Sequence, residues 1–290
     1  TEIYTLSLHD ALPICRRTEM KKSLYRFLQV ALILLFSLQA LQAGELVLQS
    51  PGGQTEIRVK VGEEITWAVT HGSSSIIQPS PLSLQVDGKE LGAAPSLIGE
   101  SRQSVDTEIT PVVAEKRSVI RDNYNELTLE FGGGFSLIFR AYDDAAAYRW
   151  KTGFDREIVV NSEIAAFRFS SDFPLFFQEE ESFFTHSERK NLHLRLSEIT
   201  PERMACCPAL VELDGGVKVA VTESDLRDYA GMYLAGGASA HCLAGRFPRF
   251  VTSEEQRGDR NVAPTERADY LARTSGDRVF PWRVLIITDS

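Results

Sequence analysis

The sequence predicts an all-β protein built as a large antiparallel β-sandwich, and three observations lead to this prediction. About a dozen short segments alternate apolar and polar residues with a period of two, which is typical of strands with one buried face. Glycine, proline and aspartate separate these segments, as they do in β-hairpins. No stretch keeps a helical period, so the strands must bury their apolar faces against one another.

The first strands are expected at residues 45–50, 55–61 and 65–69, with glycine-containing turns between them. Two more are expected at residues 75–77 and 82–86. They are predicted to be separate because the prolines between them, at positions 79 and 81, donate no hydrogen bond to a ladder.

The clearest hairpin joins residues 125–131 to residues 135–142 through three glycines, where positive φ is readily adopted. Before it, residues 88–117 are polar and are expected to be irregular, apart from a short strand at 94–98. After it, Asp143 and Asp144 are interpreted as a turn rather than as an acid pair.

The remaining chain is expected to continue with short strands. Residues 172–187 carry five phenylalanines among glutamates and predict a long aromatic loop, whose rings either carry recognition or fill the sandwich. Residues 252–278 are polar and are expected to be a loop. The strands expected in this half are 145–150, 158–160, 164–170, 210–213, 216–221, 232–234, 242–244, 249–251 and 281–288.

The first 43 residues are expected to lie outside the folded domain. Residues 1–19 precede the first methionine and are interpreted as non-native read-through. Residues 20–43 have the pattern of a secretory signal peptide, with Lys21 and Lys22 ahead of an apolar run too short to cross a bilayer. We therefore expect an exported protein, periplasmic or extracellular, that starts at residue 44 and has no membrane anchor after cleavage.

Composition narrows the function further. The formal net charge of −9 argues against a nucleic-acid partner. Three cysteines remain after the signal peptide: Cys206, Cys207 and Cys242. Their odd number and the absence of metal-ligand spacing predict free thiols. A disulfide from Cys206 or Cys207 to Cys242 stays open if the fold brings them within reach.

One stretch gathers carboxylates at the end of a strand. Valines alternate up to Val221, and Glu223, Asp225 and Asp228 follow before two tyrosines. Carboxylates in such a place usually face solvent, a sugar or a hard metal ion. Spacing alone also fits a solvated corner, and Asp228 fits a turn equally well.

Several segments, in order, resemble the N-terminal domain of glycoside hydrolase family 97. The resemblance extends over residues 44–290. The segments are 63–67 (EEITW), 78–82 (QPSPL), 118–127 (SVIRDNYNEL), 139–144 (FRAYDD), 222–234 (TESDLRDYAGMYL) and 281–283 (PWR).

This resemblance implies a super-sandwich similar to galactose-mutarotase-like sugar domains. In the family it precedes a catalytic (β/α)8 barrel, and the complete proteins are exported α-glucosidases and α-galactosidases acting on α-linked oligosaccharides. Inverting members look calcium-dependent, and Glu223 matches the calcium ligand that the sandwich donates. Asp225 and Asp228 are weak candidates for substrate contacts.

The same resemblance assigns no catalytic residue to this chain. Glycoside hydrolysis needs two carboxyl groups beside the scissile bond, and in the family both belong to the barrel. The sequence stops where that barrel would begin, so we expect the chain to be inactive alone, with the absent barrel as its partner. The barrel would also decide between inversion and retention, and the sequence does not distinguish a preference for glucosides from one for galactosides.

Two other functions remain as alternatives. The chain could be a free-standing carbohydrate-binding module that never had a barrel. It could also be a mutarotase-like epimerase, but that activity needs a histidine beside an acid, and the histidines are scattered along the sequence.

Overall fold

The computed structural model describes residues 44–113 and 116–289, and these form nearly continuous β-structure. The all-β prediction is confirmed, with 3-10 turns at Leu196–Glu198 and Asp214–Gly216 besides the strands. The proposed read-through and signal peptide, residues 1–43, lie outside the described residues. Within the described part of the chain, no helix is long and apolar enough to span a membrane.

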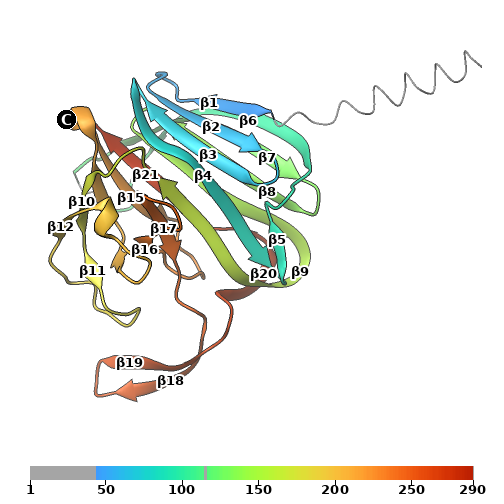
Figure 1. The fold of residues 1–290 in the computed structure, drawn as a ribbon. Coiled ribbons are helices and arrows are strands. Elements are labelled where there is room, and N and C mark those ends of the chain that lie inside the picture. The colour runs from blue at the N-terminus through green and yellow to red at the C-terminus, as the bar shows by residue number, and fades with distance from the viewer. Residues whose placement is uncertain (1–43, 114–115, 290) are drawn as a thin grey trace, which may run out of the picture. The chain divides into compact units, whose positions relative to one another are not determined.

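The strands of residues 45–289 form two antiparallel layers, apart from a separate hairpin at residues 251–267 (Figure 1). The first layer contains, in spatial order, β1 (Glu45–Gln49), β2 (Thr55–Val61), β3 (Ile65–His71), β4 (Ser74–Val86), the second half of β9 (Ala145–Arg168), β17 (Cys242–Arg246), β16 (Tyr233–Gly236), β13 (Met204–Cys206) and β11 (Glu179–Glu180).

The second layer contains β6 (Leu97–Ile109), β7 (Ile120–Phe131), β8 (Phe135–Tyr142), the first half of β9, β21 (Trp282–Thr288), β15 (Lys218–Ser224), β14 (Ala209–Glu212), β10 (Pro174–Phe177) and β12 (Leu192–Arg195). Short β5 (Lys89–Leu91) pairs with β4, and β20 (Ala272–Val279) pairs with the middle of β9.

The core fills the space between the two layers. Trp67 of β3 is fully buried, and its ring centroid lies 4.9 Å from that of Tyr148 on β9 and 6.5 Å from that of Phe139 on β8. Large aromatic rings contribute much of the buried apolar area in such a core. The alternation seen in the sequence therefore reports which residues point between the layers.

Strand β9 connects the layers, and the prediction of three separate strands there is wrong. The chain stays paired across residues 151–160 by binding β20, with a bulge between Ser275 and Asp277. Gly276 sits in that bulge, where a Cβ would collide with the carbonyl oxygen of Arg156. A bulge bends a strand and increases its twist, which lets β9 leave one layer and join the other.

Three further expectations from the sequence are wrong. Strand β4 runs through Pro79 and Pro81, because its ladder to β9 has an irregular register between Gln78 and Leu82, where those prolines lie. Residues 88–117 contain the long strand β6. Residues 252–278 contain β20 and the hairpin of β18 (Val251–Arg257) and β19 (Asn261–Arg267).

The phenylalanine-rich segment 172–187 includes two strands, β10 and β11, rather than being loop throughout. Phe173 and Phe177 are buried in the core at 7 % and 0 % exposure. Phe176 and Phe184 are 36 % and 51 % exposed. The segment therefore fills the sandwich with some rings and leaves others on the surface.

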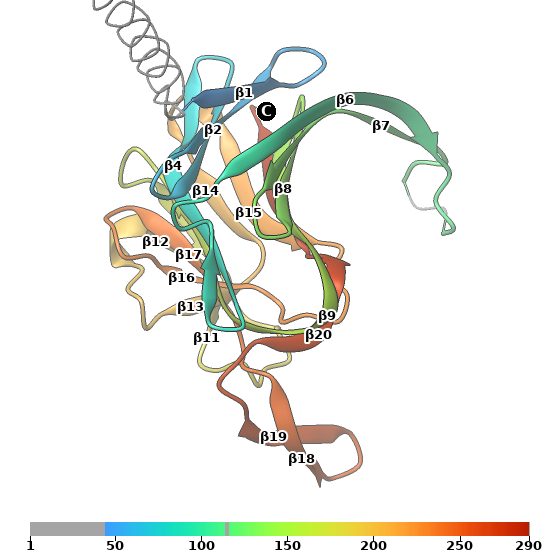
Figure 2. The ribbon, with the colours of Figure 1, turned by 90° about the vertical axis from the view of Figure 1, so that its right-hand side faces the viewer.

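Strands β6 and β7 extend beyond the second layer as a two-stranded arm. The last pair between β7 and β8 is Asn125 with Ala141, whereas β6 and β7 stay paired to Ile109 and Ile120. Figure 2 shows the arm arching away from β8. Most residues of β6 are exposed on both faces of the arm, so they show no alternation of apolar and polar side chains. For this reason the sequence did not predict β6.

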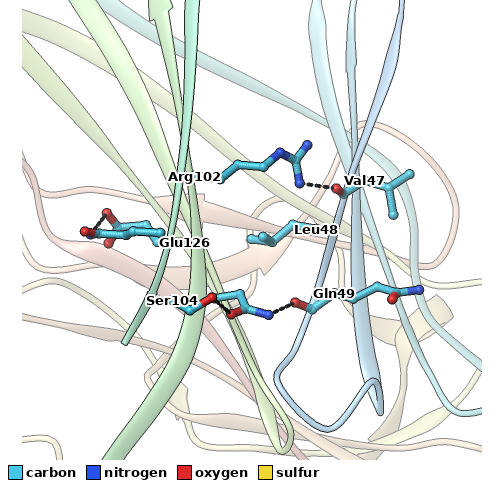
Figure 3. Close-up of a pocket in the computed structure, with 8 residues that line it drawn as sticks. Val47, Leu48, Gln49, Arg102, Ser104 and Glu126 are labelled. Atoms are coloured by element: carbon cyan, nitrogen blue, oxygen red, sulfur yellow. Dashed lines mark hydrogen bonds between the residues drawn. The ribbon is translucent and has the colours of Figure 1, made fainter. Parts of the chain in front are cut away.

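Side chains from the base of the arm contact the free edge of β1 across a cleft of 510 Å³ (Figure 3). Arg102 donates from Nη1 to the carbonyl oxygen of Val47 at 2.7 Å. Asn125 donates from Nδ2 to that of Gln49 at 2.8 Å. These donors occupy edge carbonyls that would otherwise be available to another strand.

Candidate functional site

The candidate site lies at the end of β15, where Glu223 follows two core valines. Val219 and Val221 are fully buried, and Glu223 continues the same face of the strand two residues later. The strand therefore directs the Glu223 carboxylate into one end of the sandwich rather than away from it. The interpretation as a solvated corner is excluded for this residue, since its side chain is only 13 % exposed.

Glu223 forms an ion pair with Arg283, its cross-strand partner on β21. Nη1 of Arg283 lies 2.6 Å from Oε2 of Glu223. Oε1 of Glu223 accepts the backbone N–H of Met232 at 2.9 Å. These two contacts fix the carboxylate from two directions.

Arg283 is also held by Glu163 from the opposite layer. Its Nε and Nη2 each lie 2.7 Å from a different oxygen of the Glu163 carboxylate. Both side chains are 1 % exposed. This bidentate pair joins β21 to β9 across the core, and such fork geometry is stronger and more directional than a single contact.

Aromatic rings enclose this network. The Tyr229 hydroxyl donates to Oε2 of Glu163 at 3.1 Å. The Arg283 guanidinium carbon lies 4.9 Å from the ring centroid of Phe247 and 6.0 Å from that of Tyr229. The rings exclude water and add cation–π attraction for the buried charge.

The pKa values of these groups follow from burial and from their partners. Burial raises the pKa of Glu223 above its ordinary value, although Arg283 and the Met232 N–H pull it down. Burial opposes the charge on Arg283, but attraction to Glu163 more than offsets this effect and raises the pKa of Arg283. Arg283 is therefore cationic.

Asp225 and Asp228 belong to the loop that follows β15 and have other partners. Oδ1 of Asp225 lies 2.8 Å from Nε of Arg227, and Oδ2 lies 3.4 Å from Nη1 of Arg149. The carbonyl oxygen of Asp228 accepts from Arg278 at 3.2 Å. Both aspartates have positive φ, 57° and 47°, which favours the interpretation of Asp228 as a turn residue.

The three cysteines of the described chain are free, as the sequence predicted. Cys207 lies beside the site, with its thiol donating to the Met232 carbonyl oxygen at 3.2 Å. Burial raises the pKa of Cys207 to about 12, with a further contribution from Glu223. Since the thiolate is the reactive form, this thiol is inert at neutral pH.

The residues present suit one metal ligand rather than a complete metal site. Each carboxylate oxygen can accept two hydrogen bonds, and each oxygen of Glu223 has one protein donor. Glu223 therefore keeps acceptor capacity for a hard cation. Among residues 44–113 and 116–289, no three His, Cys, Asp or Glu side chains gather in a metal-binding arrangement.

Sequence reasoning located Glu223 but missed Glu163 and Arg283. A signal was present for both. Glu163 stands in a strand next to Ile164 and Ala165, and Arg283 stands between Trp282 and Val284. A charged residue at a core-facing position of an apolar strand indicates a buried ion pair.

Comparisons place this architecture in the class of N-terminal β-sandwich domains of glycoside hydrolases. The chain matches the family described as "Glycosyl-hydrolase 97 N-terminal" over residues 48–290, and it belongs to that family. The resemblance seen in the sequence is thus confirmed.

Two curated relatives are longer proteins. A retaining alpha-galactosidase of Bacteroides thetaiotaomicron is 32% identical over 274 residues, which cover 90% of this chain and 41% of the relative. A probable retaining alpha-galactosidase of Streptomyces bingchenggensis is 32% identical over 91 residues, covering 30% of this chain and 14% of that protein. The chain thus spans about two fifths of the Bacteroides relative.

Solved structures share the fold at lower identity. A glycoside hydrolase family 97 enzyme in complex with acarbose, from Pseudoalteromonas sp. strain K8, superposes with a TM-score of 0.71 and 17% identity, covering 84% of this chain and 36% of that one. A beta-arabinopyranosidase superposes with a TM-score of 0.69 and 17% identity, covering 84% and 40%.

Proposed function

We propose that this chain is the N-terminal domain of an exported, calcium-dependent α-glycosidase, an α-glucosidase or α-galactosidase acting on α-linked oligosaccharides. Alone it is inactive, because the catalytic acid and base belong to a barrel domain. Its role is to support that barrel and to donate one calcium ligand. The family membership and the two alpha-galactosidase relatives support the proposal.

The arrangement of Glu223 is the observation that carries the calcium role. Its carboxylate stands at a strand end, partly exposed, with Arg283 and the Met232 N–H setting its direction. A ligand held by a sheet and by such neighbours keeps a fixed geometry when another domain approaches. Calcium takes six to eight oxygen ligands, so the remaining ligands would come from that other domain.

When bound, calcium would orient the substrate and polarise an oxygen atom. The contribution of this chain is positional. Glu163 holds Arg283, and Arg283 holds Glu223. The Arg283 guanidinium also compensates the negative charge of Glu223 within this chain.

The test is calcium binding by the complete polypeptide encoded by the gene of this chain. Glu223→Gln should lower calcium affinity by about tenfold or more in titration calorimetry, because changes to a metal ligand, or to the residues that orient one, have effects of that size. Glycosidase activity at limiting calcium should fall with it. Glu157→Gln, a carboxylate 65% exposed, serves as the matched control. Unchanged affinity and activity in Glu223→Gln would reject the role.

A further inference from the structure

A cleft of 400 Å³ lies between the loop that follows β15 and the base of the β18–β19 hairpin. Figure 1 shows this hairpin projecting from the rest of the sandwich. A cleft of this volume is large enough for a small ligand. We call it the arginine cleft, because Arg249, Arg267 and Arg273 are among the residues that line it.

The arginine cleft is positively charged in an otherwise acidic protein. Among the described residues that line it, three are arginines and one, Asp228, is acidic, whereas the whole chain carries a formal net charge of −9. Arg278 donates to the carbonyl oxygen of Asp228 at 3.2 Å, so a further cation stands beside the acidic residue. A concave surface lined by one sign of charge raises the local concentration of ions of the opposite sign.

Backbone carbonyl oxygens hold two of these arginines. Nη1 of Arg267 donates to the carbonyl oxygen of Arg249 at 2.6 Å. Nη1 of Arg249 donates to the carbonyl oxygens of Asn161, at 3.3 Å, and of Asp269. Among the described residues, neither guanidinium pairs with a carboxylate. A carbonyl contact orients a guanidinium without neutralising it, so both positive charges stay available to a ligand.

An aromatic pair and the third arginine complete the cleft. The ring centroid of Phe250 lies 5.5 Å from that of Tyr270, the rings are stacked, and Phe250 is 42% exposed. The Arg273 guanidinium carbon lies 5.8 Å from the Tyr270 centroid. Its 3.8 Å ion pair with Glu157 is more than half exposed on both sides and contributes little. An exposed ring beside cations suits a sugar, because the C–H bonds on one face of a pyranose pack against aromatic rings.

The arginine cleft reaches the Glu223 site. Gly231 lines the cleft, and a Cβ added to Gly231 would lie 3.5 Å from Oε1 of Glu223. Tyr229, whose hydroxyl donates to Glu163, lines it as well. A molecule bound in this cleft therefore lies beside the proposed calcium ligand.

We propose that the arginine cleft binds an acidic oligosaccharide. Arg267 and Arg273 contact an oxyanion on one sugar, either a carboxylate or a sulfate ester, and Phe250 packs against the ring of that sugar. This inference rests on the proposed function and narrows its substrate class to oligosaccharides with an anionic sugar. The planar fork of a guanidinium matches the paired oxygens of either anion, whereas a neutral sugar gains nothing from the charge of the cleft.

The test is titration calorimetry on the complete polypeptide encoded by the gene of this chain. The ligands are trigalacturonate for the carboxylate, galactose 6-sulfate for the sulfate ester, maltotriose as the neutral sugar and inorganic sulfate as the bare anion. At least one acidic sugar should bind about tenfold more tightly than inorganic sulfate, and the tighter of the two identifies the anion. Its affinity should fall as the salt concentration is raised, because ions screen exposed charges.

The first variant is Arg273→Gln, which the fold should tolerate because the only ion pair of Arg273 is long and exposed. It should lower the affinity for the acidic sugar about tenfold or more, because a charge-assisted contact is lost, and should change that for maltotriose less than twofold. Arg260→Gln is the matched control. It removes the same charge from the turn of the same hairpin, at a side chain 87% exposed, and should change both affinities less than twofold.

A second variant, Arg267→Gln, should lower the affinity for the acidic sugar to a similar extent. Its thermal stability shows whether losing the contact with the Arg249 carbonyl oxygen has altered the fold. No binding of either acidic sugar, equal losses in Arg260→Gln and Arg273→Gln, or inorganic sulfate bound as tightly as the acidic sugars would each overturn the proposal.

The outcomes separate this inference from the calcium role. If the arginine variants leave the binding of acidic sugars unchanged while Glu223→Gln still lowers calcium affinity, the arginine cleft is wrong and the proposed function stands. If Glu223→Gln has no effect while acidic sugars bind through Arg267 and Arg273, the calcium role is wrong and the arginine cleft stands.

Discussion

Glu163→Gln should destabilise this domain more than any other single carboxylate change at the site. Glu163 supplies two of the three carboxylate contacts of Arg283, and both side chains are 1% exposed. Glutamine keeps one acceptor oxygen but turns an NH2 group toward the guanidinium or toward the Tyr229 hydroxyl. Arg283 is then left with Glu223 as its only anionic partner.

The magnitude follows from that imbalance. Removing one partner of a buried ion pair costs about 3 to 5 kcal/mol, because the other charge stays buried without compensation. Glu223 still neutralises part of the charge, so the loss should lie near the lower end, about 3 kcal/mol. For a domain of this size, that corresponds to a fall in Tm of roughly 6 to 12 °C.

Urea unfolding followed by tryptophan fluorescence measures the effect, with the m-value expected to stay constant. Glu157→Gln, which removes an exposed carboxylate, should change the free energy of unfolding by less than about 0.5 kcal/mol. The triple variant Glu163→Met, Arg283→Met, Glu223→Gln should be less destabilised than Glu163→Gln, since no buried charge is left unpaired. A loss below about 1 kcal/mol for Glu163→Gln would refute this reasoning.

Three further predictions concern the rest of the sandwich. Trp67→Ala should lower the free energy of unfolding by about 3 to 5 kcal/mol, since its fully buried ring packs between the layers. Gly236→Ala should destabilise the domain by at least about 1 to 3 kcal/mol, because the added Cβ collides with the Ile199 carbonyl oxygen. Glu179→Gln should lower the free energy of unfolding by about 1 kcal/mol at neutral pH. The hydrogen bond from Arg203 lowers the pKa of Glu179 in the folded domain, so this loss should disappear as the pH falls below 4.5 and the carboxyl group becomes protonated.

Each of these has its own check. Chemical denaturation measures the first two, and Gly153→Ala is the control for Gly236→Ala, because no atom lies closer than 4.0 Å to its added Cβ. Equal losses in the two glycine variants would contradict the steric argument. For Glu179, unfolding is compared between pH 7 and pH 3; a difference from the unsubstituted protein that grows toward acid pH would contradict the sign, since only the ionised carboxylate is stabilised in the fold.

Local alternation was sufficient for the strands that bury one face. The strand predicted at residues 55–61 coincides with β2, and that at 135–142 coincides with β8. It failed where a strand has no buried face, as in β6, or where one strand serves two layers, as in β9. In those places pairing with another strand, the neighbouring β7 for β6 and the distant β20 for β9, keeps the backbone extended where the local pattern does not indicate a strand.

The sequence by itself determined the all-β class, the family, and the place of Glu223 at a strand end, because strand period and motif order are local properties. The tertiary structure alone decided what surrounds that carboxylate. Arg283 lies 60 residues from Glu223 and 120 from Glu163, and only the pairing of β15 with β21 and the stacking of the two layers bring them within hydrogen-bonding distance. The burial that makes this network strong is likewise a property of the packed sandwich, since a charge is costly only where water is excluded.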